Sequence, residues 1–130
     1  PLVSLADRAF DEAERRVGFA ASSRPRLRVY PTVAAFRDAT GEPGWVAAST
    51  LGRVIRLQPV GVLGDKLRAT LLHEMLHVVL EERAHPKAPL WLREGLVEFL
   101  AGTAQGHVAE LVRRHGREVV LGWLQRGLPP

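Results

Sequence analysis

At residues 67–80 the sequence reads LRATLLHEMLHVVL. Beyond Arg68 the segment is apolar almost all the way round, which predicts a helix buried in the interior of the protein. It nevertheless contains His73, Glu74 and His77. Burying polar side chains without partners costs several kcal/mol, and an isolated carboxylate costs far more. We therefore expect these three residues to have a specific partner.

The spacing of these residues indicates a bound metal ion. His73 and His77 are four residues apart, so they share one helix face about 6 Å apart along the axis. One zinc ion about 2.0–2.1 Å from a nitrogen of each can be reached from there. Glu74, one position round, can touch a water beside the metal, which is the arrangement of the H-E-x-x-H motif. In the competing interpretation both histidines are satisfied in the core and Glu74 pairs with an arginine such as Arg68.

A hydrolytic zinc site takes three protein ligands and keeps one position open for water. Metzincins continue the motif with a glycine and a third histidine on the same run. Leu80 and Arg83 occupy those two positions here, so this class is excluded. The third ligand must come from elsewhere in the chain.

Residues 89–99, PLWLREGLVEF, closely resemble the W-L-x-E-G-x-x-E segment of peptidase-MA-like gluzincins. The resemblance extends, with a weaker pattern, over residues 27–57. It implies a zinc metallopeptidase with one Zn²⁺ held by His73, His77 and Glu94. It also implies that Glu98, one turn further, accepts a hydrogen bond from a zinc-binding histidine, which we expect to be His73.

The chemistry of the second helix agrees with this assignment. Glu94 and Glu98 lie at i and i+4 among mostly apolar residues, where their like charges repel and a cation would relieve the repulsion. Gly95 costs a helix about 1 kcal/mol relative to alanine. We expect it to allow a close approach to the helix of residues 67–80. In the alternative interpretation, the two glutamates and Arg93 form a solvated stripe.

Peptide binding and oxyanion stabilisation are the remaining requirements of a peptidase. Gluzincins usually bind their substrate as an added strand on an exposed sheet edge. By position that edge is the run Trp45, Val46, Ala47, Ala48 and Ser49; alternatively these are only core and hairpin residues. Larger members hold the oxyanion with a Tyr or His downstream of the third ligand. No Tyr follows Tyr30, so His107 is the candidate, ahead of His115, with an ordinary surface histidine as the alternative.

The composition limits the other functions. The 130 residues fit one domain, and no apolar run approaches the roughly 20 residues that cross a bilayer. The formal charge of +4 comes mainly from scattered arginines, which predicts no nucleic-acid binding. The absence of cysteine excludes cysteine-ligated zinc. The start at Pro1, without Met or signal peptide, predicts a piece of a larger polypeptide and leaves the compartment open, export included.

Hydrophobic periodicity and turn residues predict an α+β fold. The expected helices cover residues 2–17, 32–39, 65–82 (capped by Asp65), 90–101, 104–115 and 117–126, and the expected strands cover 27–30, 45–49 and 53–57. Residues 59–64 are predicted to form a loop. We expect a single zincin-like domain, 1–130, in which a small mixed sheet (1–64) lies over a helical lower part (65–130). The active-site helix should lie at a cleft between the two parts, lined largely by Leu, Trp and Val.

These features predict a zinc-dependent peptidase that acts on a peptide or protein, with Glu74 as the general base of a metal-activated water. Two alternatives remain. The chain is a non-catalytic or weakly active zinc-binding module that regulates a larger parent protein, or it is a purely structural helical domain.

Overall fold

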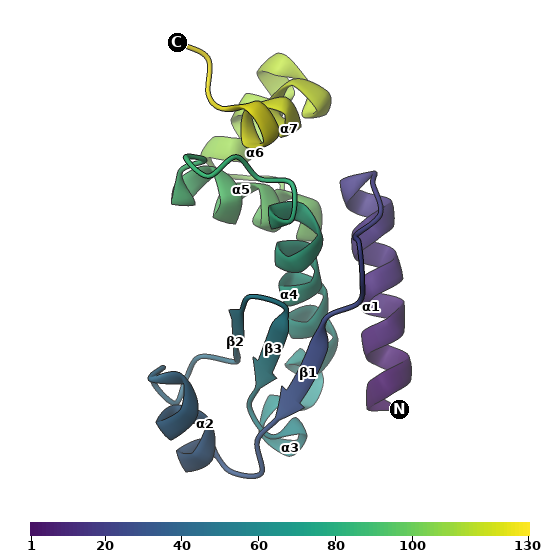
Figure 1. Cartoon of the computed structure of the whole chain (residues 1–130), viewed down its shortest axis with the longest axis vertical. Coiled ribbons are helices and arrows are strands. Elements are labelled where there is room, and N and C mark those ends of the chain that lie inside the picture. The colour runs from purple at the N-terminus through teal and green to yellow at the C-terminus, as the bar shows by residue number, and fades with distance from the viewer.

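The computed structural model describes all residues, 1–130, and has an α+β fold, as the sequence predicts (Figure 1). A small three-stranded sheet is combined with helices that make up most of the chain. The elements in chain order are α1 (Leu2–Val17), β1 (Arg26–Val29), α2 (Val33–Thr40), β2 (Ala48–Leu51), β3 (Val54–Leu57), α3 (Val60–Leu63), a 3₁₀ turn (Gly64–Lys66), α4 (Leu67–Glu81), α5 (Leu90–Ala101), α6 (His107–His115) and α7 (Arg117–Arg126).

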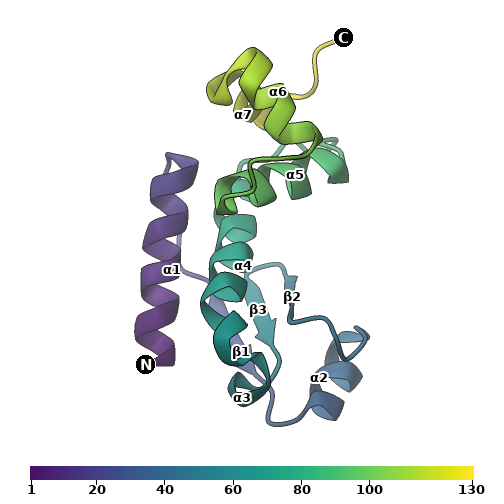
Figure 2. The same ribbon diagram turned by 180° about the vertical axis from the view of Figure 1, so that it is seen from behind.

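Helix α4 is the centre of the molecule. Both ribbon views show α1 lying along it, the sheet beside it, and α5, α6 and α7 gathered at its C-terminal end (Figures 1 and 2). Its apolar residues, such as Leu71, Leu76 and Val79, are fully buried in the main core. His73, Glu74 and His77 are only half-buried. The buried helix is thus confirmed, and its polar residues share the one stripe that the core does not cover.

The segment before α4 differs from the prediction. Residues 59–64 contain the short helix α3, and a 3₁₀ turn leads directly into α4. The residue at the N-cap is Lys66, in a helical conformation, and no side chain caps the helix. Asp65 therefore does not have the predicted role, because the continuous turn already directs the backbone into α4.

The sheet has the strand order β1-β3-β2. Strand β1 runs parallel to β3, and β2 runs antiparallel to it with Leu51 opposite Val54. The mixed sheet is confirmed, and β2 is one of its two edges. A two-residue turn, Gly52–Arg53, joins β2 to β3.

The predicted strand over residues 45–49 is displaced in the structure, because β2 covers Ala48–Leu51. Trp45 lies in a turn closed by a hydrogen bond from Val46 N to Pro43 O and is 86% exposed. The buried Gln58 side chain donates from Nε2 to the carbonyls of Gly44 and Val46. These bonds hold the backbone in a bend, so Trp45, Val46 and Ala47 are outside the strand while Ala48 and Ser49 are within it.

Gly95 provides a close approach, but to a different helix from the predicted one. A Cβ at this position would collide with the side chain of Val108 in α6. The glycine therefore seats α6 against α5, and α4 contacts another face of α5. Because Glu94 is the neighbouring residue, this packing also fixes the helix that carries it.

We expect Gly95→Ala to destabilise the protein. Overpacking a core costs about 1–3 kcal/mol and outweighs the ~1 kcal/mol that alanine contributes to a helix. Urea unfolding should show the loss, and the double variant Gly95→Ala/Val108→Ala should recover much of it. Gly61→Ala is the control, since its methyl group meets no atom within 4 Å. An equally stable Gly95→Ala single variant would contradict the packing.

None of the helices combines the length and apolar character needed to cross a bilayer.

Candidate metal centre

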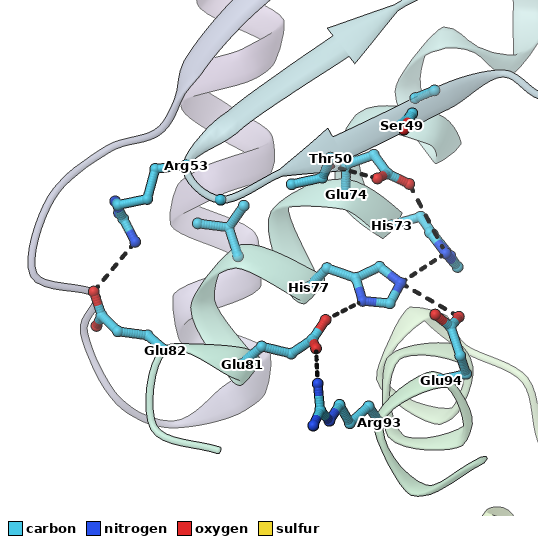
Figure 3. A pocket seen from close by; sticks show the side chains of 13 residues that line it. Ser49, Thr50, Arg53, His73, Glu74, His77, Glu81, Glu82, Arg93 and Glu94 are labelled. Carbon is cyan, nitrogen blue, oxygen red and sulfur yellow. Dashed lines mark hydrogen bonds and ion pairs between the residues drawn. The ribbon is translucent and has the colours of Figure 1, made fainter. Parts of the chain in front are cut away.

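Two neighbouring helices bring three potential ligands together. His73 and His77 project from one face of α4, and Glu94 reaches them from α5 (Figure 3). One ligand atom from each lies within 4.8 Å of the others. The two Nε2 atoms are 3.2 Å apart, and His77 Nε2 is 3.4 Å from Glu94 Oε2. The three residues predicted as metal ligands thus form one cluster.

The cluster has the dimensions that a zinc ion requires. In a tetrahedral site with bonds of about 2.0–2.1 Å, neighbouring ligand atoms are about 3.3–3.4 Å apart. The two shortest separations here fall close to this value. Two imidazoles and one carboxylate are also a donor set that zinc accepts in hydrolytic sites. The residues present therefore fit the ion.

The proton on His77 supports the same conclusion. Its Nδ1 lies 2.6 Å from Glu81 Oε2, so this nitrogen carries the proton and donates it. In the neutral ring, Nε2 then presents a lone pair toward His73 Nε2. This lone pair, 3.2 Å from His73 Nε2, can accept a hydrogen bond from that nitrogen or bind a cation in its place.

The electrostatics of the site favour positive charge. Burial lowers the pKa of His77, but the hydrogen bond to Glu81 and the charges of Glu94, Glu74 and Glu81 outweigh it, so that the pKa is raised. The pKa of Glu81 is lowered by its hydrogen bond to His77 and, against the effect of burial, by Arg93. The raised pKa shows that the surrounding carboxylates favour a positive charge at His77, whether from a proton or from a metal ion.

The metal-free protein is expected to become less stable relative to His77→Gln as the pH rises. The raised pKa of His77 contributes stability below its ordinary value of 6.5, and this is lost as the pH rises through the folded-state pKa. The lowered pKa of Glu81 contributes stability above its ordinary value of 4.5, and this stability is lost as the pH falls through the folded-state pKa. Urea unfolding with chelator should therefore show a larger wild-type advantage at about pH 5.5 than at about pH 8.5. A constant difference would contradict the charge interaction.

Glu74 lies beside the cluster without being part of it. Its Oε1 accepts a hydrogen bond of 2.7 Å from Thr50 Oγ1, and its Oε2 is 4.0 Å from His73 Nε2. The side chain is only 13% exposed. The competing interpretation paired it with Arg68, which forms no ion pair in the structure, whereas the actual partner comes from strand β2.

Glu98 and His107 have different positions relative to the cluster. Glu98 Oε1 is 3.8 Å from His73 Nδ1, on the predicted side of that ring but beyond hydrogen-bond distance. His107 begins α6 and packs against the ring of Trp91, with 5.2 Å between ring centroids. It is not among the residues that line the cleft, and His115 packs instead against Trp123.

The cleft around the cluster has a volume of about 800 Å³, and residues of β2, α4 and α5 line it. Its apolar lining is limited to Ala48 and Val78, so the predicted lining of Leu, Trp and Val is wrong. Most large apolar residues of α4 and α5 face the core instead, and Leu90 and Trp91 of α5 are exposed outside the cleft. The lining residues are Ala48, Ser49, Thr50, Gly52, Arg53, His73, Glu74, His77, Val78, Glu81, Glu82, Arg93 and Glu94.

The sequence patterns assigned no role to Glu81, Thr50 and Arg93, three polar residues of this cleft that contact the site directly or through one another. Glu81 continues the stripe of His73 and His77 at i+8, so its position was readable from helical periodicity. Thr50 gives no local signal, because it reaches Glu74 across 24 positions of sequence. Arg93 contacts Glu81 through Nη1 at 3.3 Å, which depends on how α5 crosses α4.

Comparisons of the chain with protein-family models, curated proteins and solved structures found no match. The resemblance of residues 89–99 to gluzincins therefore stays a prediction from the motif. What the site does is inferred from its own residues and geometry.

Proposed function

We propose that this chain is a zinc-dependent peptidase of the gluzincin type, with a zincin-like fold. The observation that carries the proposal is the meeting of His73, His77 and Glu94 at zinc-ligand separations, with Glu74 beside them. A purely structural domain has no need to place these residues together in an open cleft. Regulatory zinc binding alone has no need for Glu74.

Each residue has a role in this proposal. His73, His77 and Glu94 hold one Zn²⁺, which when bound polarises the scissile carbonyl and lowers the pKa of a water to about 7. Glu74 accepts the proton of the attacking water and delivers it to the leaving amine. The hydrogen bond from Thr50 orients the Glu74 carboxylate for both transfers.

Strand β2 supplies a free edge for a peptide substrate. Ala47 O accepts a hydrogen bond from Gln58 N, so the antiparallel alternation directs the backbone groups of Ser49 and Leu51 toward β3. Those of Ala48 and Thr50 face outward. An extended peptide can pair with these two residues at the cleft, where Thr50 also holds Glu74. The proposed edge is thus shifted along the chain from residues 45–49 to β2.

Thr50→Val is expected to lower kcat about 10-fold with little change in KM. Valine keeps the shape and the backbone but removes a hydrogen bond to a charged group, which is worth about 1.5–3 kcal/mol. Steady-state kinetics on a quenched fluorescent peptide measures the effect. Thr50→Ser should retain activity. Ser49→Ala, which should leave kcat unchanged, is the control, because Ser49 Oγ bonds to Arg56 and not to Glu74. Unchanged kcat in Thr50→Val would show that the bond does not assist Glu74.

The direct experiment combines metal analysis with a cleavage assay. The purified chain should contain about one zinc ion per molecule after loading and should cleave denatured casein or members of a peptide library. A chelator should abolish cleavage, and added zinc should restore it. A chain that binds no zinc contradicts the proposal entirely.

The second candidate is a non-catalytic or weakly active zinc-binding module that regulates a larger parent protein. One observation favours it. The cleft lining contains no Tyr, and its only histidines are the two proposed ligands, so the cleft offers no free Tyr or His as an oxyanion donor. Stoichiometric zinc without cleavage of any substrate in the library would support this module over the peptidase.

A further inference from the structure

We propose that Glu81, held in place by Arg93, is a positioning residue that fixes the ring orientation and tautomer of His77 and thereby prepares the zinc site. The inference rests on the proposed zinc function and deepens it. It concerns two residues that belong neither to the predicted ligands nor to the general base. Figure 3 shows their chain of contacts, from the His77 ring through Glu81 to Arg93.

The contact between His77 and Glu81 has the geometry of a strong hydrogen bond. Nδ1 and Oε2 are 2.6 Å apart, at the short end for a bond to a carboxylate. The residues are one helical turn apart in α4, so little backbone freedom separates them. Because Nδ1 carries the proton in this bond, Nε2 is the nitrogen left to face His73 and Glu94. The bond therefore selects the nitrogen that the site requires.

Arg93 fixes the other oxygen of the same carboxylate. Its Nη1 lies 3.3 Å from Glu81 Oε1, its Nε donates to Ala88 O at 2.9 Å, and its Nη2 donates to Pro86 O at 3.4 Å. The guanidinium is thus held by the connector between α4 and α5 while it holds Glu81. Since Arg93 is adjacent to Glu94 in sequence, the same contacts tie the helix of the third ligand to the helix of the first two.

The neighbouring Glu82 provides a matched comparison. It has the same side chain and also lines the cleft, but it bonds to Ser22 and pairs with Arg53 at 3.3 Å. No contact links it to His73, His77 or Glu94. Substitutions at positions 81 and 82 therefore separate a specific effect on His77 from a general loss of negative charge.

Zinc affinity, measured by competition with a chromophoric chelator, tests the inference. We expect Glu81→Met to bind zinc about 10- to 100-fold more weakly than wild type. Glu81→Gln, which keeps an acceptor without its charge, should show a smaller loss. Glu82→Gln should match wild type. Thermal unfolding of the metal-free proteins identifies any variant that fails to fold, in which case Glu81→Gln decides.

A second readout reports the tautomer directly. In nitrogen-15 NMR spectra of the zinc-loaded protein, His77 should show a protonated Nδ1 whose signal moves in Glu81→Gln, while the signals of His73 stay in place. If the wild type binds zinc and both Glu81 variants bind it equally tightly, the inference is overturned while the proposed function stands. An equal loss in Glu82→Gln would also overturn it. A wild-type protein that binds no zinc would overturn the proposed function together with the inference.

Discussion

Glu74→Gln is expected to lower kcat/KM by about 10²- to 10⁴-fold while zinc remains bound. Glutamine keeps the size of the side chain and can still accept the hydrogen bond from Thr50, but it cannot take the proton of the attacking water. Because Glu74 Oε2 is 4.0 Å from the nearest proposed ligand atom, it is close enough to act on a water in the cleft without serving as a ligand. Kinetics on a quenched fluorescent peptide and metal analysis of the same preparation measure the two properties.

Glu82→Gln is the control for this prediction, since it removes the same charge from the C-cap of the same helix, where the carboxylate bonds to Ser22 and not to the cluster. Its activity should equal that of wild type. Full activity in Glu74→Gln would exclude Glu74 as the general base. Loss of zinc from that variant would instead show that Glu74 is a ligand.

Glu94→Ala is expected to lower zinc affinity by more than about 100-fold, because a direct ligand contributes more than the residues that orient ligands. At alkaline pH, where His77 offers no positive charge for Glu94 to pair with, the metal-free variant should be as stable as wild type or slightly more stable. The side chain is 47% exposed, and its removal relieves the repulsion between the carboxylates on α5. Chelator competition and thermal unfolding without metal test the two parts separately.

Glu98→Ala is the matched variant, since it removes a carboxylate from the next turn of the same helix. Because Glu98 Oε1 lies 3.8 Å from His73 Nδ1, we expect Glu98→Ala to weaken zinc binding by about 10-fold or less. If Glu98→Ala loses more affinity than Glu94→Ala, the assignment of the third ligand is wrong and Glu98 takes that role.

The features that the sequence predicts well are those set by helical periodicity. The apolar run around His73 and His77 makes α4 the buried central helix, and the i, i+4 spacing places both imidazoles on one face. The same reasoning locates Glu94 on a second apolar helix. The crossing of the two helices was expected only through the gluzincin resemblance, yet it brings the donors together as anticipated.

The features that the sequence does not predict depend on contacts between distant residues. Strand β2 begins later than expected because Gln58 bonds to the carbonyls of Gly44 and Val46. Gly95 faces α6 instead of α4, since periodicity gives a helix its faces but not its neighbours. Thr50 reaches Glu74 only because the sheet packs beside α4. Local patterns contain no information about such pairings.

Strand β2 also has a consequence for redesign of the protein. The side chains of Ser49 and Leu51 lie on the face of the sheet opposite to that of Thr50, because successive residues of a strand alternate. These two positions can be randomised to change which sequences the edge accepts without disturbing Glu74. Thr50 offers no such freedom, since its backbone lies on the proposed docking edge and its hydroxyl holds the proposed base. For the proposed peptidase, substrate selectivity and turnover are therefore separable at Ser49 and Leu51 and inseparable at Thr50.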